Sequence, residues 1–141
     1  MGQREFFYPS APVIYPSVDQ SQVQDNIFQR IVNQYEIHAL HIDQLNKLKG
    51  IDIVLLCDDS GSMTSMGSYD HTEHRYLSRW EELKRRTRII MELAITMDPD
   101  GIDIYFLNRP PLFHVNNISQ IDLAFSIMPS GGTPLNKTFE Q

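Results

Sequence analysis

Three oxygen-bearing side chains alternate along one short loop of the sequence, at Asp58, Ser60 and Ser62. Gly61, between the two serines, gives the backbone the freedom that a tight turn needs. Such a turn can direct one carboxylate and two hydroxyls to a common point. Because hard cations such as Mg2+ take oxygen ligands in near-octahedral geometry and usually retain water, these residues predict a binding site for Mg2+ or Mn2+.

The predicted ligands would leave the metal short of negative charge. A divalent ion held by the single carboxylate of Asp58 and by neutral hydroxyls keeps much of its positive charge and attracts an anionic ligand. An Asp or Glu side chain from a partner protein would complete the coordination shell. We therefore expect a protein-binding module rather than an enzyme, with no catalytic residues.

The elements around this loop have the order of an α/β fold. Residues 51–57 form a short apolar run, typical of a strand covered on both faces, and residues 102–107 form a second. Between them, residues 80–98 show helical spacing. Strand, helix and strand in this order predict two parallel neighbours. Ligands of such sheets bind beyond the carboxyl ends of the strands, where the loop of Asp58 lies.

The remaining sequence divides the chain into three parts. Residues 1–24 mix prolines, tyrosines and glutamines without periodicity, and we interpret them as a flexible arm. Residues 25–50 have apolar residues at helical spacing, which predicts one helix or two shorter ones with Asp25 as the N-cap. Residues 51–141 hold the sheet and its site.

Shorter elements are expected on either side of the second strand. Residues 63–78 are rich in Ser, Gly, His and Asp, and we expect a loose polar insertion; Asp70, His71, Glu73 and His74 within it have no compact zinc spacing. Leu112–Val115 is a candidate third strand. Ser119 can cap a short helix over residues 120–128, and a further helix is expected to start at Leu135.

Two motifs together resemble a known family. Residues 58–63, Asp-Asp-Ser-Gly-Ser-Met after an apolar strand, are similar to the D-x-S-x-S signature of von Willebrand factor type A (vWA) domains, the metal-ion-dependent adhesion site. Residues 129–135, Pro-Ser-Gly-Gly-Thr-Pro-Leu, resemble the later loop in which that family supplies a threonine to the same metal. The motifs occur in the family's order, and the resemblance covers residues 45–141, in the style of intracellular members.

The resemblance implies a fold and a set of ligands. The fold would be Rossmann-like, a parallel sheet flanked by helices, with only its N-terminal half in this chain. Ser60 and Ser62 would bind the metal directly, and Asp58 directly or through water. Thr133 would join when a ligand is engaged. The family also uses an acidic residue after a further strand that we expect this chain to lack, which would leave the first strand with an unpaired edge.

Composition excludes several other functions. The formal net charge is -6 and there is no long Lys/Arg block, which argues against nucleic acid and anionic membranes as partners. No run of about 18 apolar residues and no apolar signal-peptide core occur, so we expect an intracellular, cytoplasmic protein. Cys57 is the only cysteine, and its apolar surroundings predict a buried thiol.

Two alternatives remain open from the sequence. Asp58 and the serines can cap a turn and a following helix without any metal, which would make the chain a structural or vestigial scaffold. A hydrolase is less favoured, because a serine nucleophile on a strand-to-helix elbow needs G-x-S-x-G and Asp58 stands two residues before Ser60. A phosphate-binding loop would need more glycines and a lysine.

Overall fold

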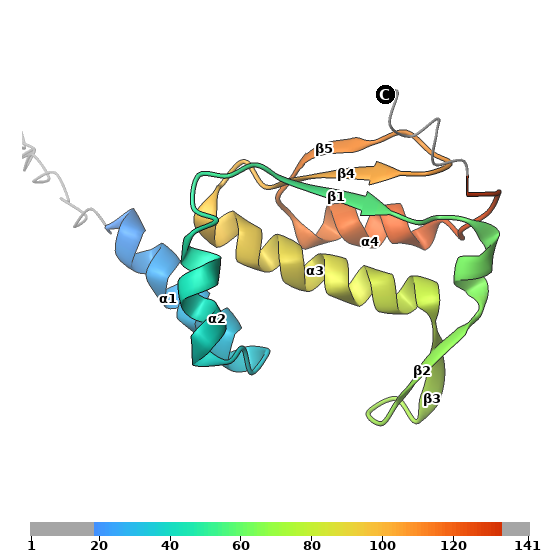
Figure 1. Cartoon of the computed structure of the whole chain (residues 1–141), viewed down its shortest axis with the longest axis horizontal. Helices are drawn as coiled ribbons and strands as arrows, with labels where there is room; N and C mark the ends of the chain where they lie inside the picture. Colours follow the sequence, from blue (N-terminus) through green and yellow to red (C-terminus); the bar gives the residue numbers. More distant parts are fainter. Residues whose placement is uncertain (1–18, 134–141) are drawn as a thin grey trace, which may run out of the picture.

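A three-stranded mixed sheet with helices on one side organises the fold (Figure 1). The computed structural model describes residues 19–133. Strand β1 (Ile53–Cys57) pairs in parallel with β4 (Ile102–Phe106), and β5 (Leu112–Val115) runs antiparallel along the other edge of β4. The two main strands are thus confirmed as parallel neighbours, and the third strand is confirmed. The order β1-β4-β5 leaves β1 at an edge of the sheet.

Helix α3 (Arg79–Met97) packs against one face of the sheet (Figure 1), and it confirms the helix expected between the two strands. It starts with a capping box, in which the Ser78 hydroxyl accepts from the Glu81 N–H and the Glu81 carboxylate accepts from the Ser78 N–H. Its buried face joins the inward residues of β4 in one core. That core is made by Cys57, Trp80, Met91, Ala94, Ile102, Ile104, Phe106, Val115, Ile121 and Phe125.

Helix α4 (Ile118–Ser126) packs beside α3 and lies on the same side of the sheet. Its N-cap is Asn117 rather than the expected Ser119. The Asn117 side chain accepts from the Ser119 N–H at 2.9 Å, and the Gln120 side chain accepts from the Asn117 N–H at 3.0 Å. Asn caps as well as Ser does, and only Asn117 has Gln120 three residues ahead to complete a capping box.

The N-terminal part of the described chain is a pair of helices, α1 (Gln20–Gln34) and α2 (Ala39–Asn46). Of the two expected alternatives, one helix or two shorter ones, the structure has the second, and the expected start at Asp25 is wrong. Asp19 caps α1 through the Ser21 N–H at 3.0 Å, so the helix takes in the last residues of the predicted arm. Residues 1–18 and 134–141, which include the rest of the arm and the helix expected from Leu135, lie outside the described residues.

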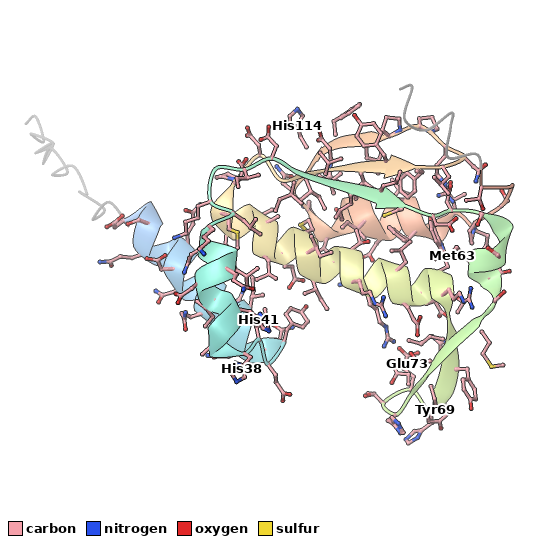
Figure 2. The ribbon with its side chains drawn as sticks, viewed as in Figure 1. His38, His41, Met63, Tyr69, Glu73 and His114 are labelled. Atoms are coloured by element: carbon pink, nitrogen blue, oxygen red, sulfur yellow. The ribbon has the colours of Figure 1, made fainter. Side chains whose placement is uncertain are left out.

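The expected loose insertion is a β-hairpin. After the single turn η1 (Gly61–Thr64), β2 (Met66–Asp70) and β3 (Arg75–Ser78) pair antiparallel and extend past the end of α3 (Figures 1 and 2). Charged residues hold this hairpin to the helix. Arg85 bonds both Asp70 and Glu73, and Arg75 bonds Glu73 and Glu81. Two of the polar residues in the expected loop, Asp70 and Glu73, are therefore ion-pair partners of α3.

Strand β1 is covered on one face only by the described residues, so the expectation of cover on both faces is wrong. Ile53, Leu55 and Cys57 point toward the core, whereas Val54 and Leu56 are 56% and 44% exposed. The reason is that α3 and α4 both lie under the sheet. Within residues 19–133, none of the helices combines the length and the apolar character needed to cross a membrane.

Two glycines with positive φ provide a matched test of backbone packing. Gly101 has φ +88°, and a Cβ atom there would collide with the Val115 carbonyl; Gly50 has φ +74° and open space around it. We expect Gly50→Ala to cost about 1–2 kcal/mol from the left-handed backbone. Gly101→Ala should cost about 1–3 kcal/mol more, because of the clash. Urea unfolding of both variants measures the difference, and equal losses would contradict this packing.

The hairpin should loosen in acid. The Arg75 guanidinium and then the Ser78 N–H lower the pKa of Glu81 from 4.5 to about 2. A carboxyl whose pKa is depressed in the folded state stabilises it above its unfolded pKa, and this is lost as the pH falls from about 4.5 to about 2. Amide hydrogen exchange in β3 should rise across that range. In Glu81→Gln the part of this pH dependence that belongs to Glu81 should vanish, leaving that of Asp70, whose pKa is also lowered to about 2. Asp100→Asn, beyond the other end of α3, should keep both parts.

Candidate metal site and its buried ion pair

The structure brings Asp58, Ser60 and Ser62 together at the carboxyl end of β1. Asp58 Oδ1 accepts a hydrogen bond from the Ser60 N–H at 2.8 Å, which closes a tight turn. The hydroxyl oxygens of Ser60 and Ser62 lie 3.1 Å apart. Ser60 is buried, Asp58 is half-buried and Ser62 is exposed, so the cluster opens to solvent on one side.

The second motif lies directly beside this loop. The Gly61 N–H donates to the Gly131 carbonyl at 3.0 Å, and the Ser130 N–H donates to the Asp59 carbonyl at 2.9 Å. Thr133 is exposed and stands at the end of the described residues, two positions beyond Gly131. Backbone hydrogen bonds therefore join the Asp58 loop to the Gly131 loop, about seventy residues further along the sequence, at the carboxyl end of β1.

Asp59 turns the opposite way from its neighbour, into the protein. It is 1% exposed, and its Oδ2 atom accepts from Arg109 Nε at 2.8 Å. Its Oδ1 atom accepts from the Asn108 N–H at 2.8 Å and from Asn108 Nδ2 at 3.2 Å. Three hydrogen bonds thus compensate a carboxylate that would otherwise be costly to bury.

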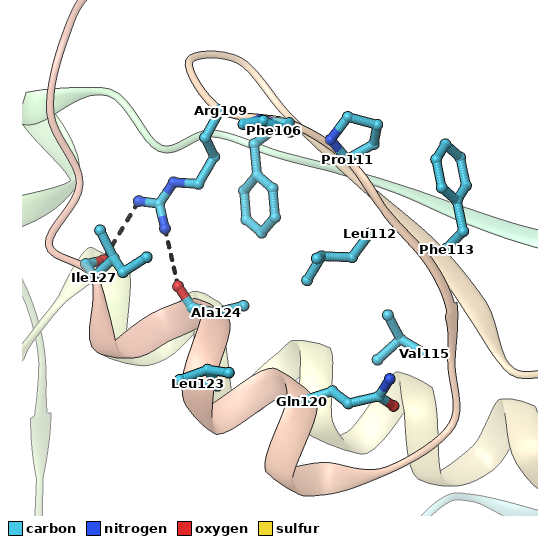
Figure 3. Close-up of a pocket in the computed structure, with 11 residues that line it drawn as sticks. Phe106, Arg109, Pro111, Leu112, Phe113, Val115, Gln120, Leu123, Ala124 and Ile127 are labelled. Atoms are coloured by element: carbon cyan, nitrogen blue, oxygen red, sulfur yellow. Dashed lines mark hydrogen bonds between the residues drawn. The ribbon is translucent and has the colours of Figure 1, made fainter.

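Arg109 connects this carboxylate to α4, and Figure 3 shows the bonds from Arg109 to the helix. Its guanidinium donates to the Ala124 carbonyl at 2.9 Å and to the Ile127 carbonyl at 3.4 Å, near the end of the helix. The same group lies over the rings of Trp80 and Phe106, 5.2 and 5.1 Å from their centres. A cation near helix-terminal carbonyls and aromatic faces is stabilised by both.

Asn108 completes the connection to the second loop. Its Nδ2 atom donates to the Gly132 carbonyl at 2.8 Å. Gly131 adopts φ +93° close to Asn108, and a Cβ atom at Gly131 would lie 2.8 Å from Asn108 Oδ1. The backbone conformation favours glycine there, and a larger residue would displace the Asn108 amide.

Sequence reasoning did not identify the roles of Asp59, Asn108 and Arg109. A signal was present, because an acidic residue follows β1 and Asn-Arg follows β4, and the carboxyl ends of parallel neighbours meet at one edge. Opposite charges at these two positions could have been paired from the predicted topology. The sequence pattern around Arg109 does not show that the Trp80 and Phe106 rings lie against its guanidinium. It therefore gave no reason to prefer Arg109 over other cationic residues as the partner of Asp59.

A mainly apolar cavity of about 500 Å3 lies beside the ion pair, between α4 and the loop that leads into β5 (Figure 3). Arg109 and Gln120 are the polar side chains in its lining. The Arg109 hydrogen bonds drawn in Figure 3 run to backbone carbonyls of α4 and its C-cap residue. The cavity therefore presents mostly hydrocarbon, including Leu112, Leu123 and Ile127.

The described residues contain neither a second candidate metal site nor a reactive thiol. In the described part of the chain, no three His, Cys, Asp or Glu side chains gather into a metal-binding cluster. Cys57 is 2% exposed, as expected, and burial raises the pKa of its thiol to about 11, which disfavours the reactive thiolate. The Asp58 site differs from such clusters because it has one carboxylate with hydroxyl oxygens.

No protein-family model matches the chain, and no curated protein or solved structure matches it. The resemblance to vWA domains thus rests on residues 58–63 and 129–135. What the structure adds is the contact between these two segments.

Loss of the Asp59–Arg109 pair should be far more costly than loss of a surface pair. Asp59→Ala leaves a guanidinium that is only 17% exposed without its counter-ion, and we expect the free energy of unfolding to fall by about 3–5 kcal/mol. Lys84→Ala removes the more exposed pair with Asp122 and should have a much smaller effect. Chemical denaturation of both variants is the measurement, and similar losses would contradict a central role for Asp59.

Proposed function

We propose that this chain is a metal-dependent protein-binding module. Asp58, Ser60, Ser62 and Thr133 bind Mg2+ or Mn2+, and the metal binds an Asp or Glu of a partner protein. The observation that carries this proposal is the 3.1 Å separation of the Ser60 and Ser62 hydroxyl oxygens in the turn closed by Asp58.

The spacing of the hydroxyls suits a magnesium ion. Adjacent ligands of an octahedral Mg2+, each about 2.1 Å from the ion, lie about 3.0 Å apart. The two serine oxygens have nearly this separation. Asp58 uses Oδ1 within the turn, and its other carboxylate oxygen can bind directly or through water. Oxygen donors of this type suit Mg2+ and Mn2+ better than softer metals.

The charge balance favours an acidic partner. The charge of Asp59 is compensated by Arg109 inside the protein, so Asp58 alone supplies negative charge to the proposed metal. The ion then retains an excess of positive charge and attracts a carboxylate from outside. Ser60 Oγ bonds Ser62 Oγ rather than a histidine or carboxylate that would activate it as a nucleophile, which favours binding over catalysis.

A Rossmann-like vWA fold is part of the same proposal. The parallel β1–β4 pair, the helix between these strands and the position of the site at their carboxyl ends support it. The intracellular setting expected from the sequence also belongs to the proposal.

Calorimetry with Mg2+ and Mn2+ on the whole chain tests the metal site. We expect saturable binding that is lost in Asp58→Ala and weakened in Ser60→Ala and Thr133→Ala. Asp100→Ala, an exposed carboxylate at the opposite end of the sheet, is the matched control and should bind metal normally. Because ligand binding stabilises the folded state, metal at about 100 times its Kd should add about 2.7 kcal/mol to the parent's stability.

The acidic-partner step has its own measurement. With Mn2+ bound, a Glu-containing peptide should lower the relaxation rate that the metal induces in water protons, because the carboxylate displaces metal-bound water. The same peptide with Gln in place of Glu should not lower it. Equal effects of the two peptides would refute carboxylate recognition. Absence of metal binding in the folded parent would instead support the scaffold alternative.

A further inference from the structure

The apolar cavity between α4 and the loop before β5 has the size and depth of a ligand site (Figure 3). Its volume of about 500 Å3 falls within the range of small-molecule pockets in proteins. Phe106 and Val115, each 1% exposed, belong to its lining, so the cavity reaches the hydrophobic core. Pro110 and Pro111 restrict the backbone of the loop on one side. One wall is therefore a stiff loop, and the other is a helix.

The helical wall is an apolar stripe of α4 that the core does not use. The helix and its C-cap line the cavity with residues at helical spacing, Gln120, Leu123, Ala124 and Ile127. Ile121 and Phe125, on another side of the same helix, are buried in the core. Leu123 and Ile127 are 72% and 59% exposed. Helix α4 thus has a second apolar face, and exposed apolar patches commonly mark a binding surface.

Water in this cavity finds few polar side chains to bond. Arg109 and Gln120 are the polar side chains of the lining, and the others are apolar. Displacing poorly ordered water by an apolar group gains affinity. A molecule with an apolar body therefore gains free energy when it enters the cavity.

Gln120 gives the cavity a hydrogen-bond donor. Its Oε1 atom accepts from the backbone N–H groups of Asn116 and Asn117 at 3.1 and 3.0 Å. These bonds fix the orientation of the amide, and its Nε2 group has no acceptor among the described residues. Figure 3 shows the amide nitrogen turned toward Val115. A ligand with one acceptor atom can satisfy this donor.

The charges around the cavity disfavour an ionic ligand. The Arg109 guanidinium is balanced by Asp59 at 2.8 Å and donates to the Ala124 carbonyl at 2.9 Å, near the negative end of α4. A carboxylate in the cavity would lose its hydration and share this cation with Asp59. A cationic ligand would lose its hydration beside a positive guanidinium. An uncharged ligand avoids both costs.

We propose that this cavity binds an uncharged small molecule with an apolar body and one hydrogen-bond acceptor, such as a ketone. The body packs against Phe106, Leu112 and Leu123, and the acceptor bonds the Gln120 amide. The site is separate from the proposed metal site, because none of the four proposed metal ligands lines the cavity.

In the proposed vWA fold, the cavity lies at the far edge of the sheet. The sheet order is β1-β4-β5, and the cavity is lined by residues of β5. In Rossmann-like sheets the fourth and later strands are added beside the first strand. Such strands would extend the sheet from β1, at the edge opposite β5, and would leave the cavity open.

The fluorescent probe prodan tests this site. Prodan is uncharged, with a naphthalene body and a ketone, and its emission brightens and moves to the blue in apolar surroundings. Titrated into the intact chain in EDTA, it should bind saturably, whether or not the metal site exists. The ketone-free compound, dimethylaminonaphthalene, should bind about three- to tenfold more weakly, since it lacks one hydrogen bond. The naphthoate, with a carboxylate in place of the ketone, should bind more weakly still.

Matched variants locate the contacts. Leu123→Asp should weaken prodan binding about tenfold or more, because it places a charge in the lining. Met128→Asp replaces a similarly exposed apolar residue outside the lining and should leave the Kd unchanged. Gln120→Glu keeps the acceptor for Asn116 and Asn117 but removes the donor. It should abolish the preference for prodan over the ketone-free compound, which loss of structure alone would not do selectively.

Each other result would overturn the proposal. No saturable binding to the folded parent, or equal affinity for the naphthoate, would overturn it outright. An unchanged ketone preference in Gln120→Glu would refute the role of the amide. Nuclear Overhauser contacts from prodan should reach the Leu112 and Leu123 methyl groups, and contacts to Leu56 instead would place the probe on the sheet surface. The parent measurements decide these points even when a variant fails to fold.

Discussion

The buried ion pair between Asp59 and Arg109 is the interaction on which the rest of the structure depends. It joins the end of β1 to the end of β4, and through the Ala124 and Ile127 carbonyls it holds the end of α4. Asn108, hydrogen-bonded to the same carboxylate, reaches the Gly132 carbonyl. One carboxylate therefore sets the relative positions of two strands, a helix and a loop.

Such a pair is favourable only when its burial is fully compensated. Removing two charges from water costs several kcal/mol for each ion, and the mutual attraction repays this only when the other hydrogen-bonding positions are also satisfied. Here backbone and amide donors complete the Asp59 carboxylate, and aromatic faces support the guanidinium. A shifted register of β1 against β4 would leave both charges unpaired, so the pair selects one register.

The same geometry explains why the neighbouring carboxylates of Asp58 and Asp59 lie in different environments. Successive residues of an extended chain point to opposite sides, so Asp59 enters the protein while Asp58 remains half-buried in the turn. Because Arg109 balances its charge, Asp59 adds no net negative charge to the outer side of the turn. Asp58, Ser60 and Ser62 thereby present an oxygen cluster with a single negative charge, on a support held by two hydrogen-bonded loops.

Local sequence pattern determined the strands of the sheet, the helix α3 between them, the parallel pairing of β1 and β4, and the turn that holds Asp58 and the serines. These features follow from periodicity and residue type over a few neighbouring positions, where chain connectivity leaves few choices. Tertiary structure decided the rest. Arg85 on α3 anchors the hairpin through Asp70 and Glu73, and the Asp59–Arg109 pair joins residues fifty positions apart. Whether β1 is covered on one face or on both depends on where distant segments of the chain pack. Ion pairs and side-chain contacts between such distant residues form only when the chain folds, so no local pattern contains them.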